Sequence, residues 1–362
     1  MKKILILHLA HWDQLMGGAE QQLKYLANYL LNKGYEVHII SLKQNDKPLE
    51  KTELISHLIP YRPIPGTFGQ TFFRFKRILL KKIKEINPDV FVTRGFTSWA
   101  GISAEIAKKY DKKHLHFIAS DNEVVRDEKK ISKRRFLNKI ELKFYLKVYN
   151  GHTKIICQNG FQSNTINTKY NIHSEIITQA APSPHGISSN KTYDVIQIVW
   201  IANLKPLKQP EKYIEIVEHF KDNNSIKFLM IGRDLGNKYQ HLLQTQCENP
   251  NFDYLGELTN DEVNVLLEKS HILINTSEYE GFSNTFVQAW MRGTVVISLN
   301  SNPDNVLTKF NIGYETITKS NTISVINKLI NNINLLKEKG DSSQKYAIEA
   351  HSIKNVYKKL DL

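Results

Sequence analysis

The sequence predicts an α/β protein with two similar domains, each built around a parallel β-sheet. Its 362 residues are about the length of two ordinary domains. Short β-branched runs alternate with amphipathic helical stretches, which is typical of a parallel sheet that helices cover on both faces. The alternation stops at residues 179–190, where Pro, Ser and Gly are concentrated and we expect an interdomain linker.

In the first half, the alternation begins at the N-terminus. A strand is expected at residues 3–9 and a helix at residues 19–32, with Gly34 just past the end of this helix. The remaining strands of this half are expected at residues 37–42, 90–93, 115–119 and 154–157, with helical stretches between them.

The alternation restarts after the linker. Strands are expected at residues 195–202, 227–231, 252–255, 272–275 and 295–299. Helices are expected at residues 210–220 and 261–269, and two polar amphipathic helices near residues 322–338 and 342–360 close the chain. Open parallel sheets bind ligands outside the carboxyl ends of their strands, so the loops that follow strands are the places to look for a site.

Composition excludes several classes of protein. Hydrophobic residues make up 41% and charged residues 23%, which is typical of a globular chain. Cys157 and Cys247 are the only cysteines, so a disulfide scaffold and a four-thiolate zinc site are excluded and a reducing cytoplasm is favoured. The longest apolar runs are about seven residues, whereas a membrane-spanning helix needs about 20. No cleavage site follows Lys2 and Lys3, so we expect a strand there and not a signal peptide.

The formal net charge of +13 belongs to the first half of the chain. Residues 1–190 hold 30 Lys and Arg against 16 Asp and Glu. Basic and apolar residues alternate at helical spacing in residues 74–84 and 129–147. Such a helix is typical of contact with an anionic membrane surface, although a solvated helix face shows the same pattern. A nucleic-acid partner is not expected, because the sequence contains no nucleic-acid-binding module.

Two glycines, Gly17 and Gly18, lie between the first strand and the first helix. Glycine lets the backbone approach a ligand closely, and a helix N-terminus offers free N–H groups to an anion. The pair is neither a dinucleotide fingerprint nor a Walker A loop. It therefore fits either a phosphate- or substrate-binding loop or a plain tight turn.

Two lysines follow the first strand of the second half. Lys205 and Lys208 precede a helix whose first turn holds Pro210. Two ammonium groups at the carboxyl end of a strand suit a diphosphate, whereas the alternative is a pair of solvated loop lysines.

The segment 275–298 combines three kinds of polar group. A strand ends, a turn at Gly281 follows, and Ser283 is expected to cap a short helix. Glu280 lies before this helix and Gln288 lies on it. The carboxylate, the N–H groups of the helix start and the amide suit a sugar, a phosphate and a ribose in succession. The alternative is a turn with surface polar residues.

Taken in order, residues 17–20, 203–208 and 280–296 resemble three motifs of the retaining glycosyltransferases of family four. The third is similar to the family's E-x7-E motif, with Gln288 in the second position. The resemblance covers nearly the whole chain. It implies the GT-B fold, in which two Rossmann-like domains face each other across a cleft and the C-terminal helix crosses back. Residues 1–185 with about 345–362 would bind the acceptor, and residues 190–344 would bind the nucleotide sugar.

The resemblance also implies roles for particular residues. Glu280 would hold hydroxyls of the donor sugar, and Lys208 would neutralise the departing nucleoside diphosphate. The implied donor and nucleotide site further includes Gly17, Gly18, Asn203, Lys205, Tyr254, Leu255, Gly281, Phe282, Ser283, Asn284 and Gln288. Charge-assisted hydrogen bonds of roughly 1.5–3 kcal/mol each make a metal unnecessary, and no Asp-x-Asp motif occurs. We expect no cofactor and no metal.

The chain departs from the family pattern at two positions. Asn203 stands where the family usually has Arg, so one charge partner of the diphosphate is missing unless Lys205 replaces it. Gln288 stands where the family often has a second Glu, so a ribose would be bound without charge assistance.

In the first half, family members often carry a His-Asp pair at the end of a strand. Here Ser120 and Asp121 follow the strand at residues 115–119. Asp121 is expected to orient the acceptor or to stabilise positive charge at the anomeric carbon, with a helix or turn cap as the alternative. His116 is expected to be a packed strand residue and not a catalyst, and His114 shares its face.

The expected function is transfer of a hexosyl or N-acetylhexosaminyl group from a nucleotide sugar to a glycan or lipid-linked acceptor. The resemblance implies retention of configuration, and surface polysaccharide biosynthesis in a bacterium is the expected context. We expect a cytoplasmic protein, peripheral on the inner face of the membrane. The alternatives are a GT-B epimerase, a phosphorylase, and an inactive partner subunit, which Asn203 and Gln288 motivate.

Overall fold

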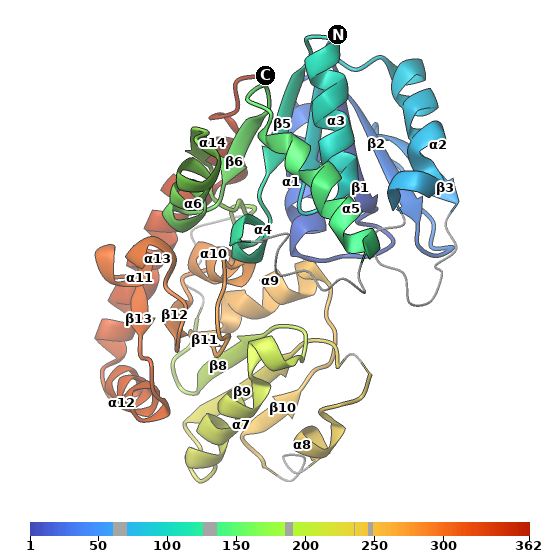
Figure 1. Cartoon of the computed structure of the whole chain (residues 1–362). Coiled ribbons are helices and arrows are strands. Elements are labelled where there is room, and N and C mark those ends of the chain that lie inside the picture. Colours follow the sequence, from blue (N-terminus) through green and yellow to red (C-terminus); the bar gives the residue numbers. More distant parts are fainter. Residues whose placement is uncertain (61–70, 126–135, 185–190, 235, 245–248) are drawn as a thin grey trace. The chain divides into compact units, whose positions relative to one another are not determined.

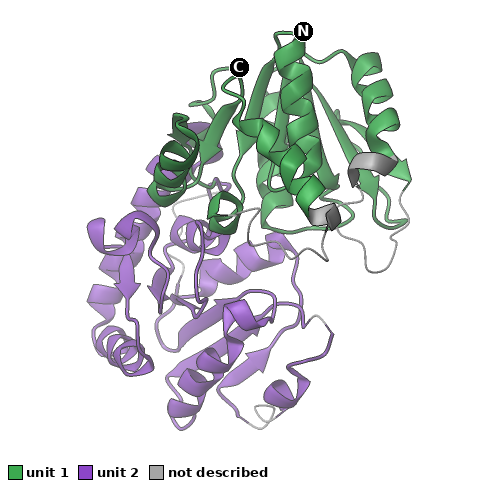
Figure 2. Cartoon of the chain, viewed as in Figure 1, with its two compact units in different colours: residues 1–179, 356–362 green, residues 180–355 purple. Residues whose placement is uncertain are grey.

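The structure is a computed structural model that describes residues 1–362 except 61–70, 126–135, 185–190, 235 and 245–248. The chain forms two compact units, shown in green and purple in Figure 2. Unit 1 consists of residues 1–179 and 356–362, and unit 2 of residues 180–355. Each unit has its own parallel β-sheet, so the predicted α/β class with two Rossmann-like domains is confirmed (Figure 1).

Unit 1 contains a seven-stranded sheet in the order β3-β2-β1-β4-β5-β6-β7, with every neighbouring pair parallel. Its strands are β1 Lys3–Ala10, β2 Glu36–Lys43, β3 Ile55–Pro60, β4 Val90–Arg94, β5 Lys113–Phe117, β6 Lys154–Cys157 and β7 Ser174–Ile176. Its helices are α1 Gly18–Leu31, α2 Thr71–Ile86, α3 Ser98–Lys109, α4 Asp121–Val125, α5 Phe136–Tyr145, η3 Leu146–Tyr149 and α6 Gly160–Tyr170.

Unit 2 contains a six-stranded parallel sheet in the order β10-β9-β8-β11-β12-β13. Its strands are β8 Ile196–Ile201, β9 Ile226–Ile231, β10 Phe252–Tyr254, β11 Ile272–Asn275, β12 Val295–Ser298 and β13 Gly313–Glu315. Its helical segments are η4 Pro206–Lys208, α7 Pro210–His219, α8 Gln240–Gln244, α9 Asn260–Lys269, α10 Asn284–Met291, η5 Pro303–Asn305, α11 Val306–Lys309, α12 Lys319–Ile330 and α13 Ile333–His351. The short helix α14 Ile353–Tyr357 follows and leads into the last residues of unit 1.

Both sheets reverse their strand order at the same point. In unit 1 the chain moves outward from β1 through β2 to β3, and then returns to pair β4 with the other side of β1. Unit 2 repeats this pattern with β8, β9, β10 and β11. Adjacent strands whose connections leave in opposite directions open a crevice at their carboxyl ends, where α/β proteins bind ligands. The loops after β1 and β4, and those after β8 and β11, are therefore the best-placed segments for a site.

The strands form because their side chains are apolar on both sides. The four residues from Ile4 to Leu7 in β1 are each 0% exposed, and Val295, Val296 and Ile297 of β12 are equally buried. A strand with no polar face must be covered on both sides, and helices on both faces of a parallel sheet provide this cover. In unit 1, α3 lies against β1, β4 and β5, and α5 packs on α3 (Figure 1).

The structure contains strands that the sequence analysis did not predict. These are the edge strands β3 and β7 and the edge strand β13. Two of them are only three residues long, so their period-two pattern is too short to read.

The two closing helices were predicted with the wrong boundaries. The break falls at Asn331 and Asn332 and not after Glu338, because the side chain of Asn332 accepts a hydrogen bond from the N–H of Leu335 and starts α13. A second break follows at Ser352, where Ala181 donates a backbone hydrogen bond to the carbonyl of His351. The helix predicted at residues 342–360 is therefore divided between the end of α13 and α14.

Helix α13 continues through Gly340 because this glycine is needed for packing. A Cβ at Gly340 would lie 2.6 Å from the backbone oxygen of Gly293, which is closer than carbon and oxygen can approach. The contact lets α13 lie against the turn after α10. A helical glycine normally destabilises a helix by about 1 kcal/mol, and close packing offsets this here.

Residues 356–362 return to unit 1 and pack on α1. The hydroxyl of Tyr357 donates to the backbone oxygen of Gln22 at 2.9 Å, and its ring lies 5.7 Å from that of Tyr29. The C-terminal segment was predicted to return to the first domain from about residue 345, but residues 345–355 belong to unit 2 and only residues 356–362 to unit 1. Two predicted features lie partly outside the described residues: the linker at 179–190 and the basic run at 129–147.

Candidate active site

In unit 2, two loops meet at the point where the strand order reverses. The first loop follows β8 and contains η4, and the second follows β11 and leads to α10. The N–H of Glu278 donates to the carbonyl of Leu207 at 2.9 Å. The hydroxyl of Thr276 donates to the carbonyl of Lys208 at 2.6 Å and accepts a hydrogen bond from the indole of Trp200 at 2.8 Å. These bonds hold the two loops side by side.

Lys208 and Glu280 form an ion pair between these loops. The side chains are 18% and 15% exposed, so the pair is shielded from water but can still be reached by a ligand. The same carboxylate oxygen, Oε1, accepts hydrogen bonds from the hydroxyl of Ser277 at 2.7 Å and the amide of Asn275 at 3.4 Å. The structure thus brings together two of the residues that the sequence analysis singled out.

Each partner in this pair keeps hydrogen-bonding capacity. Within the described part of the chain, every hydrogen bond to the Glu280 carboxylate ends on Oε1, so Oε2 remains as an acceptor. An ammonium has three N–H groups, and the described residues take up one of those of Lys208. The pair can therefore bind a hydroxyl through Oε2 and an anion through Nζ while it stays intact.

The segment from Gly281 to Asn284 leads into helix α10. Ser283 occupies the predicted N-cap position, but its hydroxyl bonds that of Thr285 at 2.8 Å and not a backbone N–H. The prediction of a side-chain cap was wrong, because Thr285 lies within reach of the same hydroxyl. Phe282 is 5% exposed and packs against the rings of Trp290 and His351. This packing anchors the backbone that precedes the helix.

Gln288 lies in α10, where it is 6% exposed. Its amide nitrogen donates to the side-chain oxygens of Asn260 at 2.8 Å and Asn264 at 3.0 Å, both on α9. Both N–H groups of Gln288 are therefore used within unit 2. Its oxygen is the atom that remains to accept a hydrogen bond from a ligand. The two asparagines were not found from the sequence, since they lie 24 and 28 residues away.

Asn203 and Lys205 are exposed, and among the described residues no side-chain hydrogen bond or ion pair joins either one to the Lys208–Glu280 pair. The carbonyl of Lys205 accepts a backbone hydrogen bond from the N–H of Lys208 at 2.8 Å. The side-chain oxygen of Asn203 accepts a hydrogen bond from the N–H of Arg233 at 3.4 Å, and Leu204 donates to the carbonyl of Arg233. Asn203 thus connects the loops that follow β8 and β9.

These loops approach each other closely at Gly232. The φ angle of Gly232 is 147°, and a Cβ there would lie 1.7 Å from the carbonyl oxygen of Ala202. Only glycine allows this approach. Tyr254 completes the cluster, because its hydroxyl donates to the carbonyl of Gly232 at 2.7 Å. Leu255, 40% exposed, donates its backbone N–H to Met230. Tyr254 and Leu255 therefore lie at the carboxyl edge of the sheet, where they were expected.

In unit 1, the Gly17–Gly18 loop connects β1 to α1. Gly17 is the N-cap of α1, and a Cβ on it would lie 2.6 Å from a carboxylate oxygen of Glu20. Glu20 bonds the ring of His8 at 2.7 Å. Burial would raise the pKa of Glu20, but the hydrogen bond and charge of His8, with the charge of Arg94, lower it below its ordinary value. The lowered pKa favours the ionised form of Glu20, whose carboxylate lies next to Gly17.

Arg94, at the end of β4, was not predicted as a site residue. Its side chain is 6% exposed, and it donates to the side-chain oxygen of Gln179 at 2.9 Å. Burial lowers the pKa of Arg94, while the carboxylates of Glu123 and Glu20 oppose this shift. Arg94 thus places a buried positive charge between the loops that follow β1 and β5. A charged residue directly after a buried strand was the available signal.

Asp121 is the first residue of α4, directly after the turn that follows β5. One of its carboxylate oxygens accepts hydrogen bonds from Gln162 at 2.8 Å and Asn159 at 3.3 Å. His116 is 0% exposed and is bonded to Thr93, Glu123 and Tyr145. The prediction that His116 is a packed strand residue agrees with this burial.

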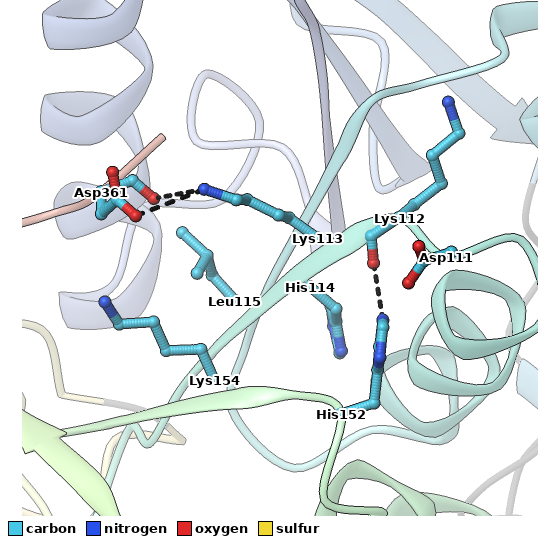
Figure 3. A pocket seen from close by; sticks show the side chains of 8 residues that line it. All are labelled: Asp111, Lys112, Lys113, His114, Leu115, His152, Lys154 and Asp361. Carbon is cyan, nitrogen blue, oxygen red and sulfur yellow. Dashed lines mark hydrogen bonds and ion pairs between the residues drawn. The ribbon is translucent and has the colours of Figure 1, made fainter.

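Unit 1 also has a pocket of about 390 Å³ at the amino ends of β5 and β6 (Figure 3). Lys113 reaches across it to Asp361, and the ring of His152 bonds the carbonyl of Lys112. The pocket contains no predicted site residue. It lies at the opposite strand ends from those where parallel sheets bind ligands, so we do not place the active site there.

Two further findings concern metals and membranes. Among the described residues, no three His, Cys, Asp or Glu side chains are grouped so that they could hold a metal ion. In the same part of the chain, no helix is both long and apolar enough to cross a lipid bilayer.

Comparison with known proteins gives the class. Two parallel Rossmann-like sheets of seven and six strands are the architecture of the GT-B fold. Residues 16–179 match the family described as Glycosyltransferase Family 4, and residues 187–350 match Glycosyl transferases group 1. The chain belongs to the family 4 glycosyltransferases, which transfer sugars from nucleotide sugars.

Solved structures share the fold. WaaG, a glycosyltransferase involved in lipopolysaccharide biosynthesis, superposes with a TM-score of 0.75 at 14% identity, over 98% of both chains. Anabaena HepE, in complex with UDP and glucose, gives 0.73 at 14% identity over 99% of this chain and 98% of that one. A variant of S. aureus TarM in complex with fondaparinux, alpha-GlcNAc-glycerol and UDP gives 0.70 at 13% identity, with the same coverage. A comparison with curated protein sequences finds no match.

Proposed function

We propose that this protein is a retaining, metal-independent glycosyltransferase of bacterial surface polysaccharide biosynthesis. It moves a hexosyl or N-acetylhexosaminyl group from a nucleoside-diphosphate sugar to a glycan or lipid-linked acceptor. The Lys208–Glu280 ion pair carries the proposal, because it supplies a cation for the leaving group and a carboxylate for the sugar at one point. That WaaG is described as acting in lipopolysaccharide biosynthesis and HepE was solved with UDP and glucose supports the substrate classes.

The donor site in this proposal is formed by unit 2. Nζ of Lys208 donates to the diphosphate, and the N–H groups of residues 282–284 at the start of α10 add the positive end of a helix dipole. Oε2 of Glu280 accepts a hydrogen bond from a sugar hydroxyl, and the side-chain oxygen of Gln288 accepts one from the ribose. The backbone at Tyr254 and Leu255 faces the base, and Lys205 takes the place of the missing arginine.

The reaction then proceeds with balanced charges. The bond between the anomeric carbon and the phosphate oxygen breaks, and negative charge develops on the leaving diphosphate, where Lys208 stabilises it. The acceptor hydroxyl forms the new bond on the same face and gives its proton to the departing phosphate. Asp121 of unit 1 orients the acceptor or stabilises positive charge at the anomeric carbon. No metal is needed, because fixed donors already stabilise the charge that develops.

We also propose that helix α2 contacts an anionic membrane surface and so brings the enzyme to a lipid-linked acceptor. Phe75, Leu79 and Ile83 point into the core of unit 1 and are at most 6% exposed. The opposite face exposes basic and apolar side chains together: Lys76, Arg77, Ile78, Leu80, Lys81 and Lys84. Basic residues with exposed aliphatic ones suit the interface of a bilayer with anionic lipids. In the second basic run, residues 129–147, the described residue Lys147 forms an ion pair with Glu105.

Binding and product analysis test the proposal. The purified chain is screened with UDP, GDP and CDP, and one of them is expected to raise the melting temperature, since a ligand at 100 times its Kd stabilises by about 2.7 kcal/mol. The matching nucleotide sugars are then supplied with glycan acceptors in EDTA, and the product anomer is determined by NMR. An inverted anomer, or activity that EDTA removes, contradicts the proposal. Nucleotide-sugar conversion without acceptor supports the epimerase instead.

A further inference from the structure

A row of hydrogen-bonded polar side chains is buried on one face of the unit 1 sheet. Its members come from β4, β5, α4, α5 and the residue that precedes β6, and none is more than 5% exposed. The row consists of Thr153, His114, Thr93, His116, Glu123 and Tyr145. His114 and His116 belong to it together because alternate residues of a strand share a face.

One consistent set of hydrogen-bond directions along this row starts at Glu123. One oxygen of Glu123 accepts hydrogen bonds from the hydroxyl of Tyr145 at 2.6 Å and from Nε2 of His116 at 3.1 Å. When the ring of His116 donates through Nε2 alone, its Nδ1 is an acceptor, and the hydroxyl of Thr93 lies 2.9 Å away as the donor.

The same argument continues to the other end of the row. The Thr93 hydroxyl has given its only proton to His116, so it accepts one from Nε2 of His114 at 2.9 Å. Nδ1 of His114 then accepts from the hydroxyl of Thr153 at 2.9 Å. Burial lowers the pKa of His114 well below its ordinary value, which agrees with the neutral ring that this assignment requires. Every donor in the row faces an acceptor.

The second oxygen of Glu123 holds the backbone outside the row. It accepts a hydrogen bond from the N–H of Ala119 at 2.8 Å. Ala119 lies in the middle of residues 118–120, the turn that connects β5 to Asp121 at the start of α4. On its other side, this turn is held by the bonds from Gln162 to Asp121. The carboxylate of Asp121 is thus fixed from two directions.

Stability alone is a poor reason for this arrangement. Removing a carboxylate from water costs free energy, and its partners in the protein interior offset this cost only in part. Apolar side chains of the same size are often as stabilising. A buried carboxylate does fix the position of the backbone, because its oxygens hold a backbone N–H at one angle and distance.

We propose that Glu123 is a positioning residue of the sugar-transfer reaction. Tied to His116 and Tyr145 through one oxygen, it holds with the other the turn that presents Asp121. The inference rests on the proposed function, specifically on a role of Asp121 in the transfer. It assigns to this buried row the task of setting the angle of that carboxylate.

A double-mutant cycle tests the inference. Glu123→Gln keeps the size of the side chain and an acceptor for Tyr145 and His116, but it places an N–H₂ group against the N–H of Ala119. We expect kcat to fall at least tenfold with the donor KM unchanged. If Glu123 acts through Asp121, then Glu123→Gln in an Asp121→Asn background lowers kcat no further. Multiplied effects would overturn the inference.

An NMR signature separates positioning from general destabilisation. In protein labelled with ¹⁵N-alanine, the Ala119 amide proton is expected to move upfield in Glu123→Gln, because its carboxylate acceptor is lost. The matched control is Glu141→Gln, which removes a similar bond from the N–H of Ser98 at 3.1 Å to a buried carboxylate. This control is expected to retain kcat. An altered Ala119 resonance with unchanged kcat in Glu123→Gln would refute the positioning role.

The remaining outcomes are also decisive. If Glu123→Gln does not fold, Tyr145→Phe is the second variant, because it removes one donor to Glu123 while keeping the ring. We expect it to lower kcat by a smaller factor, and we expect this effect to disappear in the Asp121→Asn background. If Asp121→Asn has full activity, the inference fails together with the role of Asp121, whereas the donor site at Lys208 and Glu280 stands. If Asp121→Asn is slow and Glu123→Gln is not, only the inference fails.

Discussion

Lys208 and Glu280 are 72 residues apart in the chain, yet they form an ion pair at the carboxyl edge of the unit 2 sheet. They meet because β8 and β11, the strands that precede them, are direct neighbours. Thr276 adds a second connection by donating to the carbonyl of Lys208 itself. The position of the ammonium group is therefore set by the same loop that carries the carboxylate.

Glu280→Gln is expected to lower kcat at least a hundredfold, which corresponds to about 2.7 kcal/mol of lost transition-state stabilisation. The amide is nearly the same size but has no charge to pair with Lys208 or to strengthen a bond to a sugar hydroxyl. Steady-state kinetics with saturating nucleotide sugar measure the effect. Glu278→Gln is the matched control, since Glu278 is exposed and contributes its backbone N–H to the loop contact. Full activity of Glu280→Gln would contradict the assigned site. Loss of activity would exclude the alternative that this chain is an inactive partner subunit, because the activity would then depend on its own carboxylate.

Gln288→Glu is expected to fold and to lower the donor KM about tenfold. Asn260 and Asn264 can turn their amides and donate to the new carboxylate, which then accepts charge-assisted bonds from both ribose hydroxyls. Donor titrations with the natural nucleotide sugar and its deoxyribose analogue measure this. Combining Gln288→Glu with Asn260→Asp places two carboxylates side by side and is expected to cancel the gain. If the analogue shows the same improvement, Gln288 does not contact the ribose.

Gly232→Ala is expected to lower the free energy of unfolding by about 3 kcal/mol or more, because its Cβ would overlap the carbonyl oxygen of Ala202. Gly236→Ala is the control, since Gly236 also has a positive φ of 86° but a Cβ there would meet no atom within 4 Å. It is expected to cost about 1 kcal/mol. Urea unfolding measures both. Equal losses would show that backbone conformation, and not the close approach of the two loops, makes glycine necessary.

Acid is expected to destabilise the protein partly through His271. Burial, with the charge of Lys191, lowers its pKa to about 4, and Nδ1 accepts a hydrogen bond from the N–H of Gln197. The folded state resists protonation, so the unfolded state binds the extra proton between pH 6.5 and pH 4. Stability therefore falls as the pH drops through this window, by up to about 3 kcal/mol.

His271→Asn tests the acid effect, because the asparagine oxygen can accept the same hydrogen bond without titrating. The difference in unfolding free energy between pH 7.5 and pH 4.5 is expected to shrink in this variant. The exposed His219, changed to Asn, is the control and should leave the difference as it is. If both variants keep the full acid effect, groups other than His271 cause it.

Removing the charges from helix α2 is expected to weaken binding to vesicles of phosphatidylglycerol. Each basic residue near an anionic surface contributes about 1 kcal/mol, so replacing Lys76, Arg77, Lys81 and Lys84 by Gln lowers the partition coefficient by about a thousandfold. Sedimentation with vesicles measures the bound fraction. The control changes Lys108 and Lys109, which are exposed at the end of α3. Undiminished binding of the α2 variant, or equal binding to neutral vesicles, would contradict the membrane contact.

The sequence alone determined the local structure of this protein. Alternating apolar runs and helical stretches depend on near neighbours in the chain, so most strands and the loops that follow them could be predicted. The three motifs could be placed in those loops for the same reason. The short edge strands and the boundaries of the closing helices were missed, because a three-residue strand has no readable period and Asn332, an asparagine among several, starts α13 by capping it.

Only the tertiary structure decided which loops meet. The pairing of β8 with β11 brings Lys208 to Glu280, and the packing of α9 on α10 gives Gln288 its two asparagine partners. The row that includes Glu123 depends on β4, β5, α4 and α5 and on Thr153 before β6. These contacts join residues far apart in sequence, and their energies come from burial and hydrogen bonds that exist only after the chain has folded. A local pattern holds no information about such partners.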